Sequence, residues 1–134
     1  MDRIIEELRR CNEPVPVPLD LPDMDDIIDA EEQILLSLDP EFRQFLLSVS
    51  DVVYGSIEPV TVVDPNSHTY LPEVAATAWS LGVSREVIPL CEYEEGYYCT
   101  NESGEVVYWK DGKESDEEPW ADVWQWAEGV WLDS

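Results

Sequence analysis

Hydrophobic residues recur at helical spacing in five segments of the chain. These segments are residues 2–10, 24–37, 40–49, 71–81 and 119–132. The third is the clearest, because its apolar side chains follow the i, i+3, i+4, i+7 spacing that places them on one helix face. Asp23 and the pair Asp39-Pro40 are suited to begin the second and third helices. The pattern therefore predicts five helices, each with one buried face.

Shorter apolar runs indicate strands. The runs rich in β-branched and aromatic residues are 60–63, 87–91, 96–100 and 105–109. The last two flank the Gly-containing turn 101–104, so we expect them to pair as a hairpin. Helices, a strand, a helix, a cluster of strands and a final helix are typical of an α+β fold. We expect an antiparallel-rich mixed sheet with helices packed on one side and end.

The segment 13–22 contains four prolines, which exclude a helix and favour an extended, polyproline-like connector. Two interpretations stay open: a stiff spacer laid along the body, or a ligand for an aromatic groove in another protein. We expect residues 1–22 to form an N-terminal helix and this connector. Residues 23–134 are then long enough for one α+β domain and too short for two.

The formal charge of the chain is −24, because 31 Asp and Glu face only 7 Lys and Arg. A disordered acidic tail would lack the 44% hydrophobic content found here, which includes six Trp and six Tyr. We therefore expect a folded, very acidic protein. We expect neither nucleic acid nor an anionic membrane as its partner, because proteins that bind these need clustered Lys and Arg.

The cysteines and the first residues bear on the cellular compartment. Cys11, Cys91 and Cys99 are odd in number and form no Cys-x-x-Cys, which argues against a disulfide framework. Residues 1–11 are too charged for the apolar core of a signal peptide. No apolar run approaches the ~20 residues of a membrane span. These features predict a reduced, cytoplasmic protein.

Candidate catalytic and metal-binding residues do not form a recognisable pattern. His68, the only histidine, lies in a loop-like Pro-Asn-Ser-His run without a nucleophile at a suitable spacing, so we expect a surface residue. The acidic run 23–29 lacks the turn glycine of a calcium loop, and Ile34 stands where the last ligand would be Glu. Nothing selects one catalytic pair among so many carboxylates. We therefore expect no enzyme, no cofactor and no metal site.

Several segments resemble the SUKH family in order along the chain. Leu38-Asp-Pro-Glu-Phe-Arg-Gln-Phe-Leu-Leu47 resembles its Pro-x-x-Phe/Tyr-x-x-Phe-Leu motif. Val87-Ile-Pro-Leu-Cys91 is similar to its Ile-Pro-Ile-Ala strand, and Glu94-Glu-Gly-Tyr-Tyr-Cys-Thr100 to its Gly-Asp-x-Tyr-Cys-Leu-Asp strand. Ser103-Gly-Glu-Val-Val-Tyr-Trp109 is similar to its Gly-x-Val-x-x-Trp, and the Trp-rich last helix to its Ser-Phe-x-x-Trp-Leu. The resemblance extends from Met24 to Leu132.

The SUKH superfamily groups bacterial immunity proteins of polymorphic toxin systems with fungal regulators of cell-wall synthesis. The resemblance implies an α+β sheet wrapped by helices, no catalytic activity, and function through binding of a protein. The chain departs from the family pattern at two places. Ser50-Asp51 replaces the usual Asn-Gly-Gly, and Thr100-Asn101 replaces the usual Leu-Asp. These differences suggest a distant branch of the family.

The charge far exceeds the net charge of roughly 2 to 8 with which a small domain stays soluble. Together with the resemblance, it predicts an immunity protein that neutralises a basic toxin domain, a nuclease among the candidates, through electrostatic and aromatic contacts. The predicted contact residues are Glu92, Glu94, Glu95, Asp111, Glu114, Asp116, Glu117, Glu118 and Trp120. The acidic helix 23–32 is the second choice.

Two alternatives remain open at this point. The chain could be an intracellular regulator or scaffold of cell-wall or signalling proteins, without a toxin partner. The acidic surface could also serve solubility alone.

Overall fold

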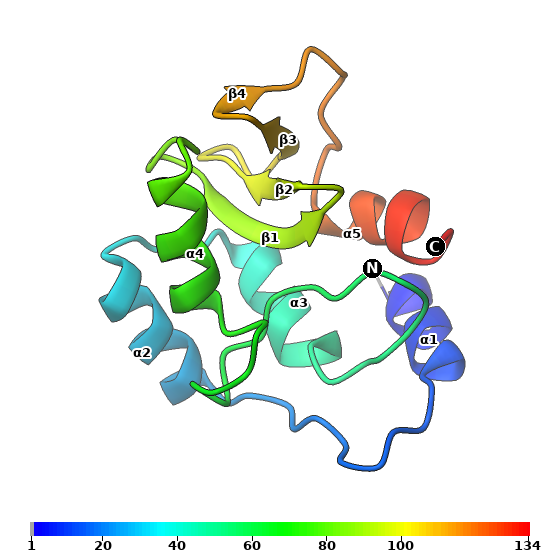
Figure 1. Cartoon of the computed structure of the whole chain (residues 1–134). Helices are drawn as coiled ribbons and strands as arrows, with labels where there is room; N and C mark the ends of the chain where they lie inside the picture. The colour runs from blue at the N-terminus through cyan, green and yellow to red at the C-terminus, as the bar shows by residue number, and fades with distance from the viewer. Residues whose placement is uncertain (1) are drawn as a thin grey trace.

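The computed structural model describes residues 2–134 and shows helices surrounding a small sheet (Figure 1). The helices are α1 (Asp2–Cys11), α2 (Met24–Ile34), α3 (Pro40–Val49), α4 (Leu71–Ser80) and α5 (Val123–Trp126), which continues into a π-helical turn, η1 (Ala127–Trp131). Each of the five predicted helices is present. Within the described residues, none of these helices has both the length and the hydropathy to cross a bilayer.

Side-chain caps explain where α2 and α3 begin. The Asp23 carboxylate accepts a hydrogen bond from the Asp26 amide at 2.9 Å, and Asp26 accepts one from the Asp23 amide at 3.1 Å. This reciprocal capping box satisfies amides that have no partner within the helix. At α3, Asp39 accepts from the Phe42 amide at 3.2 Å, and Pro40 occupies the first turn, where its missing N–H is no loss. The predicted starts of both helices are confirmed.

The sheet has four strands in the order β1-β2-β3-β4, and all neighbouring pairs are antiparallel. The strands are β1 (Ile88–Tyr93), β2 (Gly96–Thr100), β3 (Val106–Lys110) and β4 (Lys113–Glu114). The predicted hairpin and the α+β class are confirmed. Successive side chains of β2 point to opposite faces. Tyr97 packs in a cluster with Ala78 of α4, whereas Tyr98 contacts Trp126 of α5.

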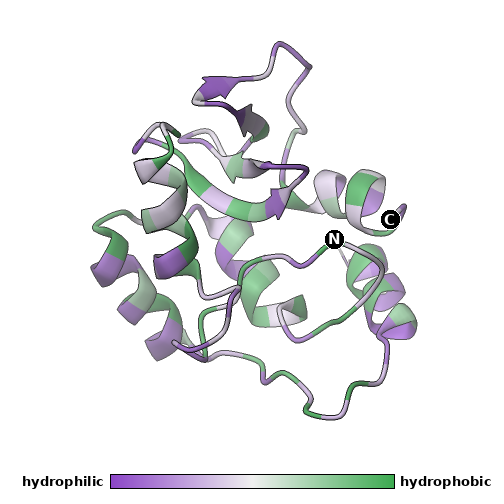
Figure 2. Cartoon of the chain, in the orientation of Figure 1, coloured by the Kyte–Doolittle hydropathy of each residue, from purple (hydrophilic) through white to green (hydrophobic). Residues whose placement is uncertain are grey.

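The main core joins α3 to the C-terminal helix through aromatic rings. Phe45 is fully buried, and its ring centroid lies 5.6 Å from that of Trp124, 6.3 Å from Trp126 and 5.8 Å from Trp131. Figure 2 shows hydrophobic residues along α3, which lies at the centre of the molecule. This aromatic cluster packs against the face of the sheet that carries Tyr98, since Trp126 contacts the Tyr98 ring.

Helix α1 packs on this same core, since Ile4 and Leu8 belong to the main hydrophobic cluster. The connector then runs along the outer edge of the molecule to α2 (Figure 1). Its first part is attached to the body by Glu13, whose amide donates to the Val53 carbonyl at 2.7 Å and whose carboxylate accepts from the Gly55 amide at 2.9 Å. Helix α1 therefore contributes to the core, and the connector contributes to the surface beside it.

The strand predicted at residues 60–63 is wrong. This segment makes only isolated bridges, Pro59 to Cys91 and Thr61 to Tyr70. Proline has no N–H to extend a ladder along β1. After the Val60 amide has donated to the Leu90 carbonyl, the chain turns away and pairs with its own continuation.

The predicted boundaries of two helices are also wrong. The last helix begins at Val123 instead of residue 119, because the amide and carbonyl of Trp120 are both paired with Val106 at 2.9 Å. Asp122 then provides the cap by accepting from the Gln125 amide at 2.8 Å. Helix α2 ends at Ile34 instead of residue 37, because the next residue adopts a left-handed conformation.

All three cysteines are free thiols. Cys91 and Cys99 are buried and Cys11 is partly exposed. Burial raises the pKa of the Cys91 thiol to about 12, and burial likewise raises the pKa of Cys99. Because the thiolate is the reactive form, these two buried thiols are not suited to nucleophilic chemistry at neutral pH.

Candidate functional site

Three tyrosines from three strands form a row on one face of the sheet. Tyr98 of β2 lies directly opposite Tyr108 of β3, and their ring centroids are 5.0 Å apart. The ring centroid of Tyr98 is also 5.6 Å from that of Tyr93 at the end of β1. All three rings are partly exposed. Tyr98 also contacts Trp126, at 5.7 Å between centroids, so the core fixes its position. We call Tyr93, Tyr98 and Tyr108 the tyrosine row.

Two tight turns place carboxylates at the end of this row. The turn between β1 and β2 consists of Glu94 and Glu95, whose φ angles are 46° and 65°. The turn between β3 and β4 consists of Asp111 and Gly112, with φ angles of 54° and 74°. Two positive φ angles in succession are what a type I′ hairpin turn requires. The hydroxyl of Tyr108 donates to the Tyr93 carbonyl at 2.7 Å and to that of Glu94 at 3.2 Å, which fixes the first turn against the row.

The tyrosine hydroxyls experience the negative charge of these turns. The pKa of Tyr108 is raised, first by burial and then by the charges of Glu94, Asp111 and Glu95. The pKa of Tyr98 is raised to about 12, again first by burial, with Glu117 among the contributing charges. Glu94, Glu95 and Asp111 therefore lie near one end of the tyrosine row, and Glu117 lies near Tyr98. We call the row and these acids (Glu94, Glu95, Asp111 and Glu117) the tyrosine–acid surface.

The acids of this surface have no basic partner among residues 2–134. The ion pairs in this part of the chain use Arg3, Arg9, Arg10, Arg43 and His68, all with acids other than the eight predicted as contacts. All eight are exposed. The two lysines of the β3–β4 hairpin, Lys110 and Lys113, are likewise in none of these ion pairs. The carboxylates are therefore available to a cation from outside the described chain.

The remaining predicted acids lie elsewhere. In the strand register, Glu92 lies opposite Tyr97 and Glu114 lies opposite Trp109. Because side chains alternate along a strand, both acids lie on the face of the sheet opposite to the tyrosine row. Asp116 and Glu118 are exposed in the loop that leads to the last helix. The structure thus brings four of the eight predicted acids to one surface and distributes the other four around it.

Trp120 was predicted to contact a partner, and the structure packs its ring against the C-terminal helix. A Cβ atom added to Gly129 would lie 2.5 Å from the indole ring. The side chain is partly exposed, as the three tyrosines are, so its contact with a partner stays a prediction. The aromatic groups that border the acids are the tyrosines, which the sequence analysis did not select.

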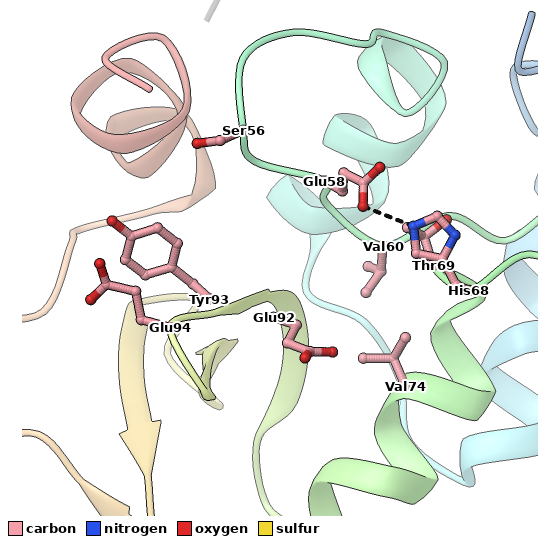
Figure 3. A pocket seen from close by; sticks show the side chains of 9 residues that line it. All are labelled: Ser56, Glu58, Val60, His68, Thr69, Val74, Glu92, Tyr93 and Glu94. Atoms are coloured by element: carbon pink, nitrogen blue, oxygen red, sulfur yellow. Dashed lines mark hydrogen bonds and ion pairs between the residues drawn. The ribbon is translucent and has the colours of Figure 1, made fainter.

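A hollow of about 280 Å³ lies beside the row, along the edge of β1 (Figure 3). Its lining includes Glu58, Glu92 and Glu94 together with the ring of Tyr93. His68, at its rim, is exposed as predicted and lies 2.8 Å from Glu58, with Nε2 and Oε2 as the closest atoms. The hollow extends the negative surface from the turns towards α4.

The arrangement is suited to binding cations. Arginine can stack on partly exposed tyrosine rings while its guanidinium pairs with nearby carboxylates, and this surface offers both kinds of group. In the described residues, no three His, Cys, Asp or Glu side chains converge closely enough to hold a metal ion.

Comparison with known proteins identifies the family. The family model SUKH_5, described as SMI1-KNR4 cell-wall, matches residues 1–132. The chain belongs to this family. A crystal structure of a protein from Pseudomonas syringae pv. tomato is similar to this SUKH_5 member, with 57% sequence identity, a TM-score of 0.96 and coverage of 100% of both chains. No curated protein matches the chain. The resemblance to SUKH proteins noted in the sequence is confirmed.

The turn Glu94–Glu95 carries a conformational cost in this SUKH_5 member. Non-glycine residues at positive φ are strained by about 1–2 kcal/mol each, and Asn and Gly relieve that strain. We expect Glu94→Asn/Glu95→Gly to raise the free energy of unfolding by about 1 kcal/mol in urea denaturation. Glu94→Gln/Glu95→Gln is the control, because it removes the same charges and keeps the strained backbone. If both variants gained equally, charge repulsion and not backbone strain would be the cause.

Proposed function

We propose that this SUKH_5 protein is a protein-binding module that neutralises a basic toxin domain through the tyrosine–acid surface. One observation carries the proposal. Glu94, Glu95 and Asp111, in two hairpin turns, and Glu117 lie beside three partly exposed tyrosine rings, and none has a basic partner within the described chain. Family membership supports a protein-binding role of this kind.

The charge favours a fast encounter with a cationic partner. Electrostatic steering raises association rates from roughly 10⁵–10⁶ M⁻¹s⁻¹ towards 10⁸–10⁹ M⁻¹s⁻¹. An antitoxin benefits from such rates because it must bind before damage is done. A toxin that cleaves nucleic acid has a basic cleft, and exposed carboxylates can occupy that cleft as phosphates would. The tyrosines then supply rigid aromatic contacts, which often dominate the affinity of an interface.

In this proposal the chain blocks the active site of the toxin by binding to it and catalyses no reaction itself. The exposed His68 pairs with Glu58, and the two buried thiols are held in the protonated form. The side chains suited to function are therefore the carboxylates and rings of the surface.

The experiment first asks whether a gene beside that of this chain encodes a large secreted protein with a cationic C-terminal domain, which we call the neighbouring toxin domain. We expect a one-to-one complex, protection of cells when both are co-expressed, and a stopped-flow association rate that falls at least about tenfold between low and high salt. A rate indifferent to salt would contradict the electrostatic mechanism. A neighbouring gene without such a domain, or a domain that does not bind, would contradict the toxin assignment.

A second candidate function is that of a regulator or scaffold of cell-wall proteins inside the cell. The family description, SMI1-KNR4 cell-wall, favours it. Its partner would be neutral or proline-rich, and its association rate would change little with salt. The salt series therefore also separates the two functions.

A further inference from the structure

Exposed apolar side chains gather in one segment of the chain, residues 17–35. Among residues 2–134, seven large hydrophobic side chains are exposed, and six of them lie in this segment: Val17, Leu19, Leu21, Met24, Ile28 and Leu35. The most exposed are Val17 at 81% and Leu35 at 82%. Single exposed apolar residues are common on protein surfaces, but a contiguous group of them marks an interaction site.

Helix α2 arranges part of this group as a stripe. Met24 and Ile28 are four residues apart, so they lie on the same helix face, and both are more than 40% exposed. Leu35 follows directly after the helix, in a left-handed conformation with φ of 61°. The adjoining face of α2 is already used, because Ile27 and Ile34 are buried in the main core and Ile27, three residues after Met24, lies next to it on the helix surface. The stripe is therefore the exposed margin of the apolar side of α2, and no other part of the described chain covers it. Figure 2 shows hydrophobic and hydrophilic segments alternating along α2.

The connector extends this apolar surface. Val17 and Leu19 line a hollow of about 230 Å³ together with Val52 and Ile57 from the loop after α3. The connector itself runs from α1 to the start of α2 along the outer edge of the molecule (Figure 1), so Val17 and Leu19 lie beyond the N-terminal end of the stripe.

Acids border the stripe on one side. Asp25, Asp29 and Glu32 are spaced four and three residues apart, so they form a neighbouring row on α2, and all three are exposed. None of them takes part in an ion pair within residues 2–134. The sequence contains no Lys or Arg between Arg10 and Arg43. The row is therefore purely negative.

We propose that the stripe and its acid row form a docking site for a basic amphipathic helix of a protein partner. Such a helix presents an apolar face to Met24, Ile28 and Leu35, and flanking Lys or Arg side chains to the acid row. A second copy of this chain is disfavoured because two acid rows repel each other, and an anionic lipid surface is disfavoured for the same reason. The site is separate from the tyrosine–acid surface, and the proposal does not depend on a toxin as partner.

The test uses the full chain and a synthetic amphipathic peptide with Leu on one helix face and Lys beside it. Three triple variants are compared by isothermal titration calorimetry. The apolar variant is Met24→Gln/Ile28→Gln/Leu35→Asn, which uses residues compatible with a helix and with a left-handed end. The acid variant is Asp25→Asn/Asp29→Asn/Glu32→Gln. The control is Asp2→Asn/Glu6→Gln/Asp133→Asn, which removes the same charge from exposed positions of α1 and the C-terminal end that belong to neither surface and take part in no ion pair within the described chain.

We expect saturable one-to-one binding of the peptide to the wild type, weakened at least about tenfold in the apolar variant and about threefold to tenfold in the acid variant. The control should bind within about twofold of the wild type. Circular dichroism checks that each variant is folded, and since the substituted side chains are exposed, folding should be retained.

Three results would overturn the proposal. The apolar variant could bind as tightly as the wild type, or the control could lose as much affinity as the acid variant. A peptide with the same composition in scrambled order could also bind equally well, since only net charge would then be recognised. Binding of the wild type to vesicles of anionic lipid, or self-association that the apolar variant abolishes, would assign the stripe to a membrane or to a second copy instead.

Discussion

A variant without the four acids of the tyrosine–acid surface should associate with the neighbouring toxin domain about ten- to a hundredfold more slowly than the wild type at low salt. The variant is Glu94→Gln/Glu95→Gln/Asp111→Asn/Glu117→Gln. All four side chains are exposed and lie outside the core, so the fold should be retained. The rate falls because these charges attract the cationic partner from a distance and orient it towards the tyrosine row. Stopped-flow fluorescence measures the rate, and its dependence on salt should become weaker as well.

A matched variant separates local from total charge. Asp20→Asn/Asp25→Asn/Asp29→Asn/Glu32→Gln also removes four exposed acids, from the connector and α2. We expect its association rate to stay within about threefold of the wild type, because its tyrosine–acid surface is intact. An equal loss in both variants would show that only the net charge matters. A larger loss in the α2 variant would make the acidic helix, the second choice from the sequence, the main toxin contact.

Phe45→Ala should lower the free energy of unfolding by about 3–5 kcal/mol, a large part of the stability of a domain of this size. The Phe45 ring is fully buried between the indoles of Trp124, Trp126 and Trp131, so its removal leaves a cavity at the centre of the core. Urea denaturation followed by tryptophan fluorescence measures the change.

Phe45→Leu is the control for this prediction. Leucine keeps much of the apolar volume of phenylalanine, and we expect the free energy of unfolding to fall by only about 1–2 kcal/mol. If Phe45→Ala lowered the free energy of unfolding by less than about 1 kcal/mol, the three indoles would have moved into the cavity. The C-terminal helix would then be less firmly attached to α3 than its contacts indicate.

The starts of α2 and α3 could be predicted from the sequence because helix caps are local. Asp23 and Asp39 need only the next few amides, and the spacing of apolar residues fixes the buried face. The start of the last helix could not be predicted in this way. It depends on the pairing of Trp120 with Val106, two residues that are distant in the sequence.

The tyrosine row depends on the register of the hairpin, which the predicted turn gets wrong by one residue. A four-residue turn at 101–104 would place Tyr98 opposite Val107. The structure has a five-residue turn and places Tyr98 opposite Tyr108. A shift of one residue moves a side chain to the other face of a sheet, so a small error in turn length hides the row.

The sequence does contain a signal for β4. Asp-Gly is a favoured pair for a type I′ hairpin turn, and Asp111-Gly112 follows directly after the strand predicted at 105–109 and Lys110. The same alternation explains why the predicted acids divide between two faces. Neighbours such as Glu92 and Tyr93 must point in opposite directions, and a list of acids along the chain does not contain that information.

The central claim is that the acids around the tyrosine row form a docking surface for cationic groups. The most direct measurement is an NMR titration of the isotope-labelled full chain with a tetra-arginine peptide at low salt. We predict saturable shift changes concentrated at Tyr93, Glu94, Glu95, Tyr98, Tyr108, Asp111 and Glu117, which weaken as salt is added. Shift changes spread evenly over all the acidic residues of the chain, or confined to α2, would contradict the claim.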